Sequence, residues 1–228
     1  AAFERWHAAV SADVDVIDAL AHTPTWFAHS YVNTHLRSTR HAPRAYGLGY
    51  DRLNRRHPFT DTVRHRLDRR VGRGLLQAIA AAAPDVVIAT HFFPLSVLGQ
   101  AKLRGELDVP LVGVVTDHAA HAFWAEPGVD RFCVAAGGAE RDLQRHGTPA
   151  NHIVTTGIPI RQAFGRAPLV EDYGGELNVL VTSGGFGIGP MATTIRSFAG
   201  ISGVKLTEVC GDNDKRVIGT LSSGTDIT

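Results

Sequence analysis

The chain has 228 residues, 44% of them hydrophobic and 20% charged, which is an ordinary composition for a globular protein. Its formal net charge of +1 provides no overall field that would draw it to nucleic acid. No apolar run approaches the ~20 residues of a membrane-spanning helix, and the distant Cys133 and Cys210 form no metal or redox motif. We therefore expect a cytoplasmic protein with reduced cysteines.

The first residues have the apolar spacing of a helix, and residues 14–17 (VDVI) follow as a short strand candidate. A fold of alternating strands and helices should begin with a strand and a tight loop. We therefore expect a strand and a loop to precede Ala1, which would make this chain a fragment of a longer protein.

The segment that starts at Trp26 and ends at Arg73 combines aromatic side chains with eleven arginines and only three acidic residues. Three interpretations stay open. The segment could form solvated amphipathic helices, since runs of charge usually lie on an exposed face. It could instead lie on an anionic membrane surface, where basic and aromatic side chains act together. Nucleic-acid binding is the third interpretation, although the segment lacks a zinc or aromatic RNA-binding signature.

The centre of the chain has the pattern of one strand–helix–strand unit. Residues 85–89 and 111–115 are apolar runs rich in Val and Ile, typical of buried parallel strands, and residues 94–104 have helical spacing between them. Polar side chains follow both runs, and open α/β sheets bind ligands beyond the carboxyl ends of their strands. The sequence therefore predicts a site at this edge, formed by His91, Asp117, His121 and Trp124. Each residue alone is more often a loop residue, a helix cap or a core residue.

The later elements divide the chain into two domains. Residues 75–83 and 139–146 are predicted helices, and residues 129–135 and 152–155 are predicted strands. Residues 161–176 mix Pro, Gly and acidic residues, as linkers between domains do. We expect an α/β fold with an N-terminal domain at 1–160, this linker, and the start of a second nucleotide-binding-type domain at 177–228.

The second domain opens with a strand at 177–181 that leads into a Gly-rich loop and a helix. This arrangement can direct backbone N–H groups and a helix N-terminus at a phosphate. The loop matches neither the dinucleotide-binding nor the P-loop pattern, so a plain tight turn is the alternative. A further strand, 206–210, ends beside Gly211 and Asn213.

Together these motifs resemble one family. HFFPLSVLGQAKLRGELDVPLVGVVTD (91–117), HAFWAEPGVDRF (121–132), TGIPIRQAF (156–164), TSGGFGIGP (182–190) and VCGDN (209–213) are similar, in order, to motifs of the monogalactosyldiacylglycerol synthase and processive diacylglycerol glycosyltransferase family. That family is related to the lipid II-forming enzyme of peptidoglycan synthesis. The resemblance implies the GT-B fold, with two Rossmann-like domains, and the metal-free transfer of a hexose from a UDP-sugar to diacylglycerol or a related lipid.

The resemblance also implies roles for residues. The acceptor side would be formed by His91, Phe93, Pro94, Asp117, His121 and Trp124. The UDP-sugar would be bound by Ser183, Gly184, Gly185, Phe186, Gly187, Gly211 and Asn213. The usual catalytic base of the family lies in a Gly-rich loop that would precede Ala1, which leaves Asp117 or His91 as the base within this chain. No cofactor and no metal are expected.

Two alternatives remain. A UDP-sugar epimerase shares this architecture, and a non-catalytic fragment could retain the fold and still bind lipid or membrane. Under the transferase interpretation, we expect a peripheral membrane protein that touches anionic lipid through the segment from Trp26 to Arg73. The sequence does not distinguish galactose from glucose as the transferred sugar.

Overall fold

We describe the protein from a computed structural model. The structure describes residues 12–42, 47–49, 52–54, 58–161, 164, 175, 177–182, 191–198, 201–209 and 220–221. The chain divides into two compact units, Ala1–Arg166 and Ala167–Thr228, which are considered separately. The predicted N-terminal helix and Gly-rich loop lie outside the described residues, as do Gly211 and Asn213.

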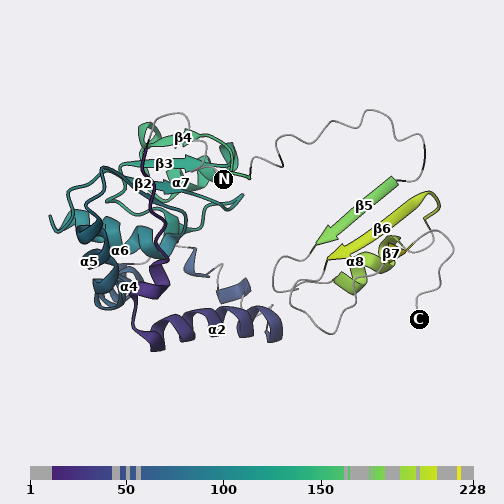
Figure 1. The fold of residues 1–228 in the computed structure, drawn as a ribbon, viewed down its shortest axis with the longest axis horizontal. Coiled ribbons are helices and arrows are strands. Elements are labelled where there is room, and N and C mark those ends of the chain that lie inside the picture. Colours follow the sequence, from purple (N-terminus) through teal and green to yellow (C-terminus); the bar gives the residue numbers. More distant parts are fainter. Residues whose placement is uncertain are drawn as a thin grey trace. The chain divides into compact units, whose positions relative to one another are not determined.

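A parallel four-stranded sheet forms the centre of the first unit (Figure 1). Its strands follow the chain in the order β1 (Val87–Ala89), β2 (Leu111–Val114), β3 (Arg131–Val134) and β4 (Ile153–Thr155). Leu111 and Val134 are fully buried, as expected where helices cover a parallel sheet. The predicted α/β fold class is confirmed, whereas the GT-B arrangement of two domains stays a prediction.

Helices connect and cover these strands. The helices of the first unit include η1 (Ala19–His22), α2 (Thr25–His41), α4 (Pro58–Val71), α5 (Arg73–Ala82), α6 (Phe92–Leu103), η2 (Ala122–Trp124), α7 (Gly137–Arg145) and η3 (Ala150–His152). The chain passes from β1 through α6 to β2, which is the strand–helix–strand unit that the sequence predicted. Helix α6 is buried on most of its surface because it packs on β1 and β2, on α4 and α5, and on η2.

Helix α6 has definite start and stop signals. The ring of His91 caps it, since its Nδ1 accepts a hydrogen bond from the Phe93 N–H at 3.2 Å. After the last turn the backbone reverses at Gly105, whose φ of 70° is a conformation that glycine adopts without strain. These signals fix where the side chains after β1 emerge.

The strand predicted at residues 14–17 is wrong. Residues 12–18 form neither helix nor strand, and η1 follows them directly. The apolar spacing was correct in one respect, because Ile17 packs against the hydrophobic core as strand residues do. A strand also needs a partner to accept its backbone hydrogen bonds, and β1 pairs only with β2 in the described sheet.

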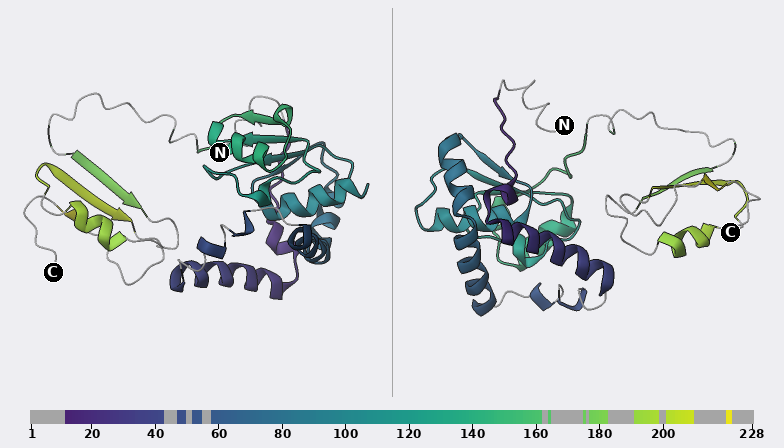
Figure 2. Two further views of the ribbon diagram at one scale, coloured as in Figure 1. Left: turned by 180° about the vertical axis from the view of Figure 1, so that it is seen from behind. Right: turned by 60° about the horizontal axis from the view of Figure 1, so that its bottom comes forward.

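The second unit contains a smaller sheet. Strands β5 (Leu177–Thr182) and β6 (Val204–Val209) run parallel, β7 (Thr220–Leu221) is antiparallel to β6, and α8 (Met191–Phe198) lies between β5 and β6 in the chain (Figures 1 and 2). Leu206 is buried, at 3% exposure. This is the strand–loop–helix–strand order that the sequence predicted after residue 176.

Candidate functional site

The candidate site lies at the carboxyl edge of the first sheet. Because β1 and β2 are parallel and adjacent, the residues that follow them emerge at the same edge. Thr90 and His91 follow β1, and Thr116 and Asp117 follow β2 at the start of the turn that leads to η2. We call this edge, with the aromatic side chains described below, the aromatic rim.

A hydrogen bond joins Asp117 to Trp124. The indole Nε1 of Trp124 donates to Oδ2 of Asp117 at 2.8 Å. Asp117 is exposed, whereas Trp124 is buried at 1% exposure. A buried indole therefore fixes one carboxylate oxygen, and the carboxylate keeps acceptor capacity toward solvent.

His91 is exposed at the rim and has a defined tautomer when neutral. Its Nδ1 accepts the hydrogen bond from the Phe93 N–H, so the neutral ring carries its proton on Nε2. In that form Nε2 is a hydrogen-bond donor. The geometry therefore suits Asp117 for accepting a proton better than it suits His91.

Two other predicted site residues are buried. His121 caps η2 through its Nδ1, which accepts from the Phe123 N–H at 3.2 Å, and the residue is only 3% exposed. Phe93 is 4% exposed and packs on Phe27, with 5.3 Å between ring centroids. Both side chains therefore pack in the interior next to the rim and are not exposed on its surface. Pro94 is half-buried and lines the groove described below.

Aromatic rings that the sequence did not single out complete the rim. Phe92 lies against His91, with 4.2 Å between ring centroids, and its ring is 6.1 Å from that of Trp124. Phe123 is 5.6 Å from Phe92, and Tyr31 of α2 approaches His91 at 6.2 Å. Phe92 and Phe123 adjoin predicted residues, which was the available signal, whereas Tyr31 reaches the rim only through tertiary packing.

A buried network of charged side chains lies behind η2. The Glu126 side chain is fully buried, and its Oε1 accepts hydrogen bonds from Arg64 and His65 of α4. Burial acts to raise the pKa of Glu126, but the hydrogen bonds and positive charge of His65 and Arg64 outweigh it and lower the pKa to about 2. Glu126 is therefore an ionised carboxylate inside the protein.

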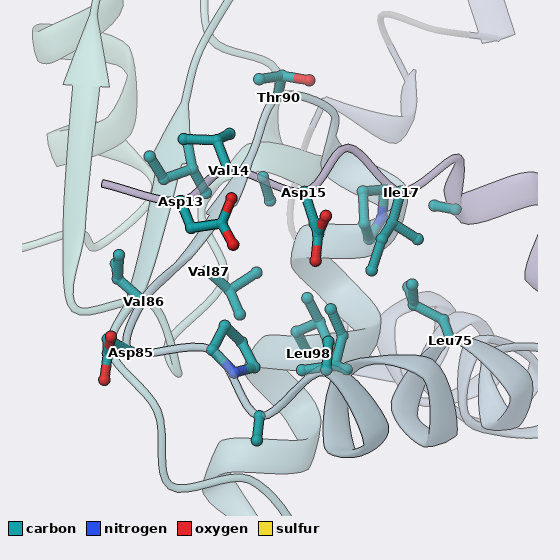
Figure 3. A pocket seen from close by; sticks show the side chains of 18 of the residues that line it. Asp13, Val14, Asp15, Ile17, Leu75, Asp85, Val86, Val87, Thr90 and Leu98 are labelled. Carbon is teal, nitrogen blue, oxygen red and sulfur yellow. The ribbon is translucent and has the colours of Figure 1, made fainter. Parts of the chain in front are cut away.

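A groove of about 400 Å³ runs along the side of β1 that faces away from β2 (Figure 3). Asp85 lies at one end and Thr90 at the other, while Asp13 and Asp15 of the N-terminal segment form part of its wall. Apolar side chains, including Leu75 and Leu98, form its floor. Within the described residues, no three His, Cys, Asp or Glu side chains are grouped so that they could hold a metal ion.

The predicted nucleotide-binding residues are not described. Ser183 to Gly187 fall between β5 and α8, and Gly211 and Asn213 follow β6. Their roles stay predictions. The described strand β5 ends at Thr182, directly before this loop.

A family model described as monogalactosyldiacylglycerol (MGDG) synthase matches residues 3–160. A processive diacylglycerol beta-glucosyltransferase from Bacillus mycoides (strain KBAB4) is 30% identical over 142 residues, covering 58% of this chain and 35% of that protein. A protein of the same name from Bacillus thuringiensis (strain Al Hakam) is 31% identical over 147 residues, covering 60% of this chain and 37% of that protein. The chain thus spans little more than a third of the length of these relatives.

Among solved structures, the apo form of the lipopolysaccharide outer core galactosyltransferase WaaB is 14% identical, with a TM-score of 0.38 over 59% of this chain and 39% of that chain. None of the described helices is both long enough and apolar enough to cross a membrane.

Proposed function

The chain belongs to the monogalactosyldiacylglycerol synthase family, and on that premise we propose that it serves the transfer of a hexose from a UDP-sugar to diacylglycerol or a related lipid. The observation that carries the proposal is the aromatic rim, because it combines an oriented carboxylate with apolar rings at a ligand-binding edge of the sheet. The names of the curated relatives describe glucosyl transfer to diacylglycerol, which supports the proposal.

Asp117 would act as the base in this chain. The acceptor hydroxyl oxygen forms a bond to the anomeric carbon of the sugar while the bond from that carbon to the UDP phosphate oxygen breaks. The hydroxyl proton passes to the Asp117 carboxylate, which the Trp124 indole holds in place. His91, with its proton on Nε2, would donate a hydrogen bond to the acceptor.

The donor would be bound by the second unit. Ser183, Gly184, Gly185, Phe186 and Gly187 would offer backbone N–H groups to the UDP diphosphate, and Gly211 and Asn213 would lie beside the nucleotide. Leaving UDP develops negative charge, which fixed backbone dipoles can stabilise without a metal. The support here is the sequence pattern after β5 and β6.

Helix α4 would dock the protein on an anionic membrane. Three apolar side chains of its first turns face outward, with Phe59 71%, Val63 52% and Leu67 43% exposed, whereas Arg64 and Asp68 face inward and Val71 at its end is buried. This orientation reverses that of an ordinary solvated amphipathic helix. The exposed arginines of the same helix and its junction with α5 supply complementary charge, each worth about 1 kcal/mol near anionic headgroups; they are Arg66, Arg69, Arg70 and Arg73.

The chemistry is tested by Asp117→Asn in the complete polypeptide, with radiolabelled UDP-hexose and diacylglycerol vesicles. We expect product formation to fall by about 10²–10⁴-fold, which is the usual contribution of general-base catalysis. Asp108→Asn, another exposed acidic residue of the same domain, is the control and should leave the rate unchanged. An unchanged rate in Asp117→Asn would exclude this base, and sugar epimerisation without lipid would favour the epimerase alternative.

Docking is tested by cosedimentation with vesicles of phosphatidylcholine alone or mixed with phosphatidylglycerol. Val63→Glu places a charge in the centre of the α4 stripe and should weaken binding at least about tenfold, since it removes apolar burial and repels the headgroups. Leu103→Glu, at a 57% exposed apolar position at the end of α6, is the matched control. Equal loss in both variants would show that no particular face binds the vesicles.

A further inference from the structure

The buried network behind η2 joins helix α4 to the aromatic rim. Arg64 donates to Glu126 through Nη2 and to Ser96 Oγ of α6 through Nη1, the latter at 2.9 Å. Gln100 of α6 donates to the other oxygen of Glu126 at 3.2 Å. Ser96 in turn donates to Asp68 Oδ2 at 2.7 Å, so that α4 and α6 share one polar contact surface.

The same arginine touches the rim directly. Its guanidinium carbon lies 5.0 Å from the centroid of the Phe123 ring, which is within range of a cation–π contact. Glu126 follows Trp124 by two residues, and the Glu126 N–H donates to the Trp124 carbonyl at 2.8 Å. The ion pair therefore contacts the chain before Trp124, through Phe123, and after it, through Glu126.

We propose that Arg64 and Glu126 are positioning residues that hold Phe123 and Trp124, and through Trp124 the Asp117 carboxylate, in fixed relation to helix α4. The inference rests on the proposed function only in naming the rim an acceptor site and the outer face of α4 a docking face. If both hold, docking on a membrane presents the rim at a set height and orientation to a lipid headgroup.

Stability alone does not account for a buried ion pair of this kind. Replacing both partners of such a pair by apolar side chains of similar size is often neutral or stabilising, because desolvation costs about as much as the attraction gains. Removing one partner is costly, since it leaves a buried charge unpaired. The replacement of both partners therefore removes the pair without leaving Glu126 as an unpaired buried charge, and the position of Trp124 is then measured in the folded protein.

The test uses the full chain with Trp6 and Trp26 replaced by Phe, so that Trp124 is the single tryptophan and can be excited selectively. We compare this background with its Arg64→Met/Glu126→Met double variant by thermal unfolding and by acrylamide quenching of the folded protein. We expect a red-shifted emission and a quenching constant about twofold higher in the folded protein, because η2 opens locally without its clamp. The unfolding midpoint should fall, because the buried Asp68 also loses the charge of Arg64.

The control is Arg69→Met/Glu106→Met. This pair also joins α4 to the segment after α6, but both side chains are exposed, and Glu106 keeps no charge to pair with Arg104 either. Its emission and quenching should match the background. Arg64→Lys is the second test variant, because it keeps a charge beside Glu126 while it removes the planar group over Phe123, and it should raise quenching in the same direction.

A folded double variant with unchanged Trp124 quenching would overturn the proposal. If the double variant does not fold, unchanged quenching in Arg64→Lys would overturn it. Failure of the proposed function is distinguishable, because it would appear as absent vesicle binding or glycosyl transfer in the unsubstituted protein, while the Trp124 measurement would stand.

Discussion

At the residue scale, the pKa values of two carboxyl groups in one buried network are shifted in opposite directions. Burial raises the pKa of Asp68, and the hydrogen bond from Ser96 and the charge of Arg64 offset this only in part. Burial also acts to raise the pKa of Glu126, yet the hydrogen bonds and charges of His65 and Arg64 prevail and lower it to about 2. Arg64 donates a hydrogen bond to Glu126, the carboxylate next to the rim, and lies farther from Asp68, at 3.7 Å.

The lowered pKa of Glu126 predicts a specific loss of stability in acid. The unfolded chain, with a carboxyl pKa near 4.5, takes up a proton before the folded protein does. The stabilisation by ionised Glu126 is therefore complete above about pH 4.5 and disappears as the pH falls toward 2. The difference in unfolding free energy between wild type and Glu126→Gln should shrink by about 3 kcal/mol over that window.

Urea unfolding of the full chain at successive pH values measures this difference. Asp108→Asn, which removes an exposed carboxyl group of the same domain, should follow the wild-type curve through the window. Parallel curves for wild type and Glu126→Gln between pH 5 and 2 would mean that Glu126 is not held ionised by Arg64 and His65.

The rim shows which site residues a sequence can reveal. Asp117 and Trp124 stand seven residues apart in a turn after a recognisable strand, and the structure joins them by a hydrogen bond. Arg64 and Glu126 stand 62 residues apart. Among the described arginines between Trp26 and Arg73, Arg64 turns inward to Ser96 of α6 and to Glu126, and that tertiary information is absent from local spacing.

At the element scale, the turn after η2 packs directly on α6. An added Cβ at Gly128 would lie 2.0 Å from the carbonyl oxygen of Gly99, which is a backbone atom that cannot turn away. The close approach brings residues 126–129 against the helix, and it also sets Glu126 opposite Gln100. The network therefore requires a residue without a side chain at position 128.

Gly128→Ala is accordingly expected to destabilise the first unit by at least about 1–3 kcal/mol, the usual range for overpacking of a close contact. Gly137→Ala at the start of α7 is the control, because its added Cβ would meet only the Arg141 side chain at an ordinary 3.5 Å. Denaturant unfolding compares the two substitutions. Equal stability of the two variants would show that α6 and the turn are not packed as closely as described.

Most helices and strands of the first unit form where the local sequence pattern predicts them, and the exceptions have physical causes. Buried parallel strands such as β2 are apolar throughout, and α6 has both a cap and a stop, so they are recognisable from sequence. Residues 14–17 have the composition of a strand but no described partner strand, and pairing is not encoded in composition. The outward apolar stripe of α4 has helical spacing, but spacing does not say which face is buried.

At the scale of the whole molecule, two sheets form in two separate units. Each has its own buried residues, with Leu111 fully buried in the first sheet and Leu206 3% exposed in the second. Because no strand pairing connects the described sheets, the stability of one unit should depend little on the core of the other. The proposed division of labour, with lipid at one unit and UDP at the other, requires that each unit keep its own fold.

Calorimetry of the full chain should therefore resolve two unfolding transitions. Leu111→Ala removes a fully buried side chain, costs about 2–5 kcal/mol, and should lower one midpoint only. Leu206→Ala should lower the other midpoint, by an amount that reflects a smaller surrounding core. A single transition that both substitutions shift together would show that the two units unfold as one cooperative body. Lipid binding and nucleotide binding would then be coupled through the stability of the whole chain, because neither unit would fold independently.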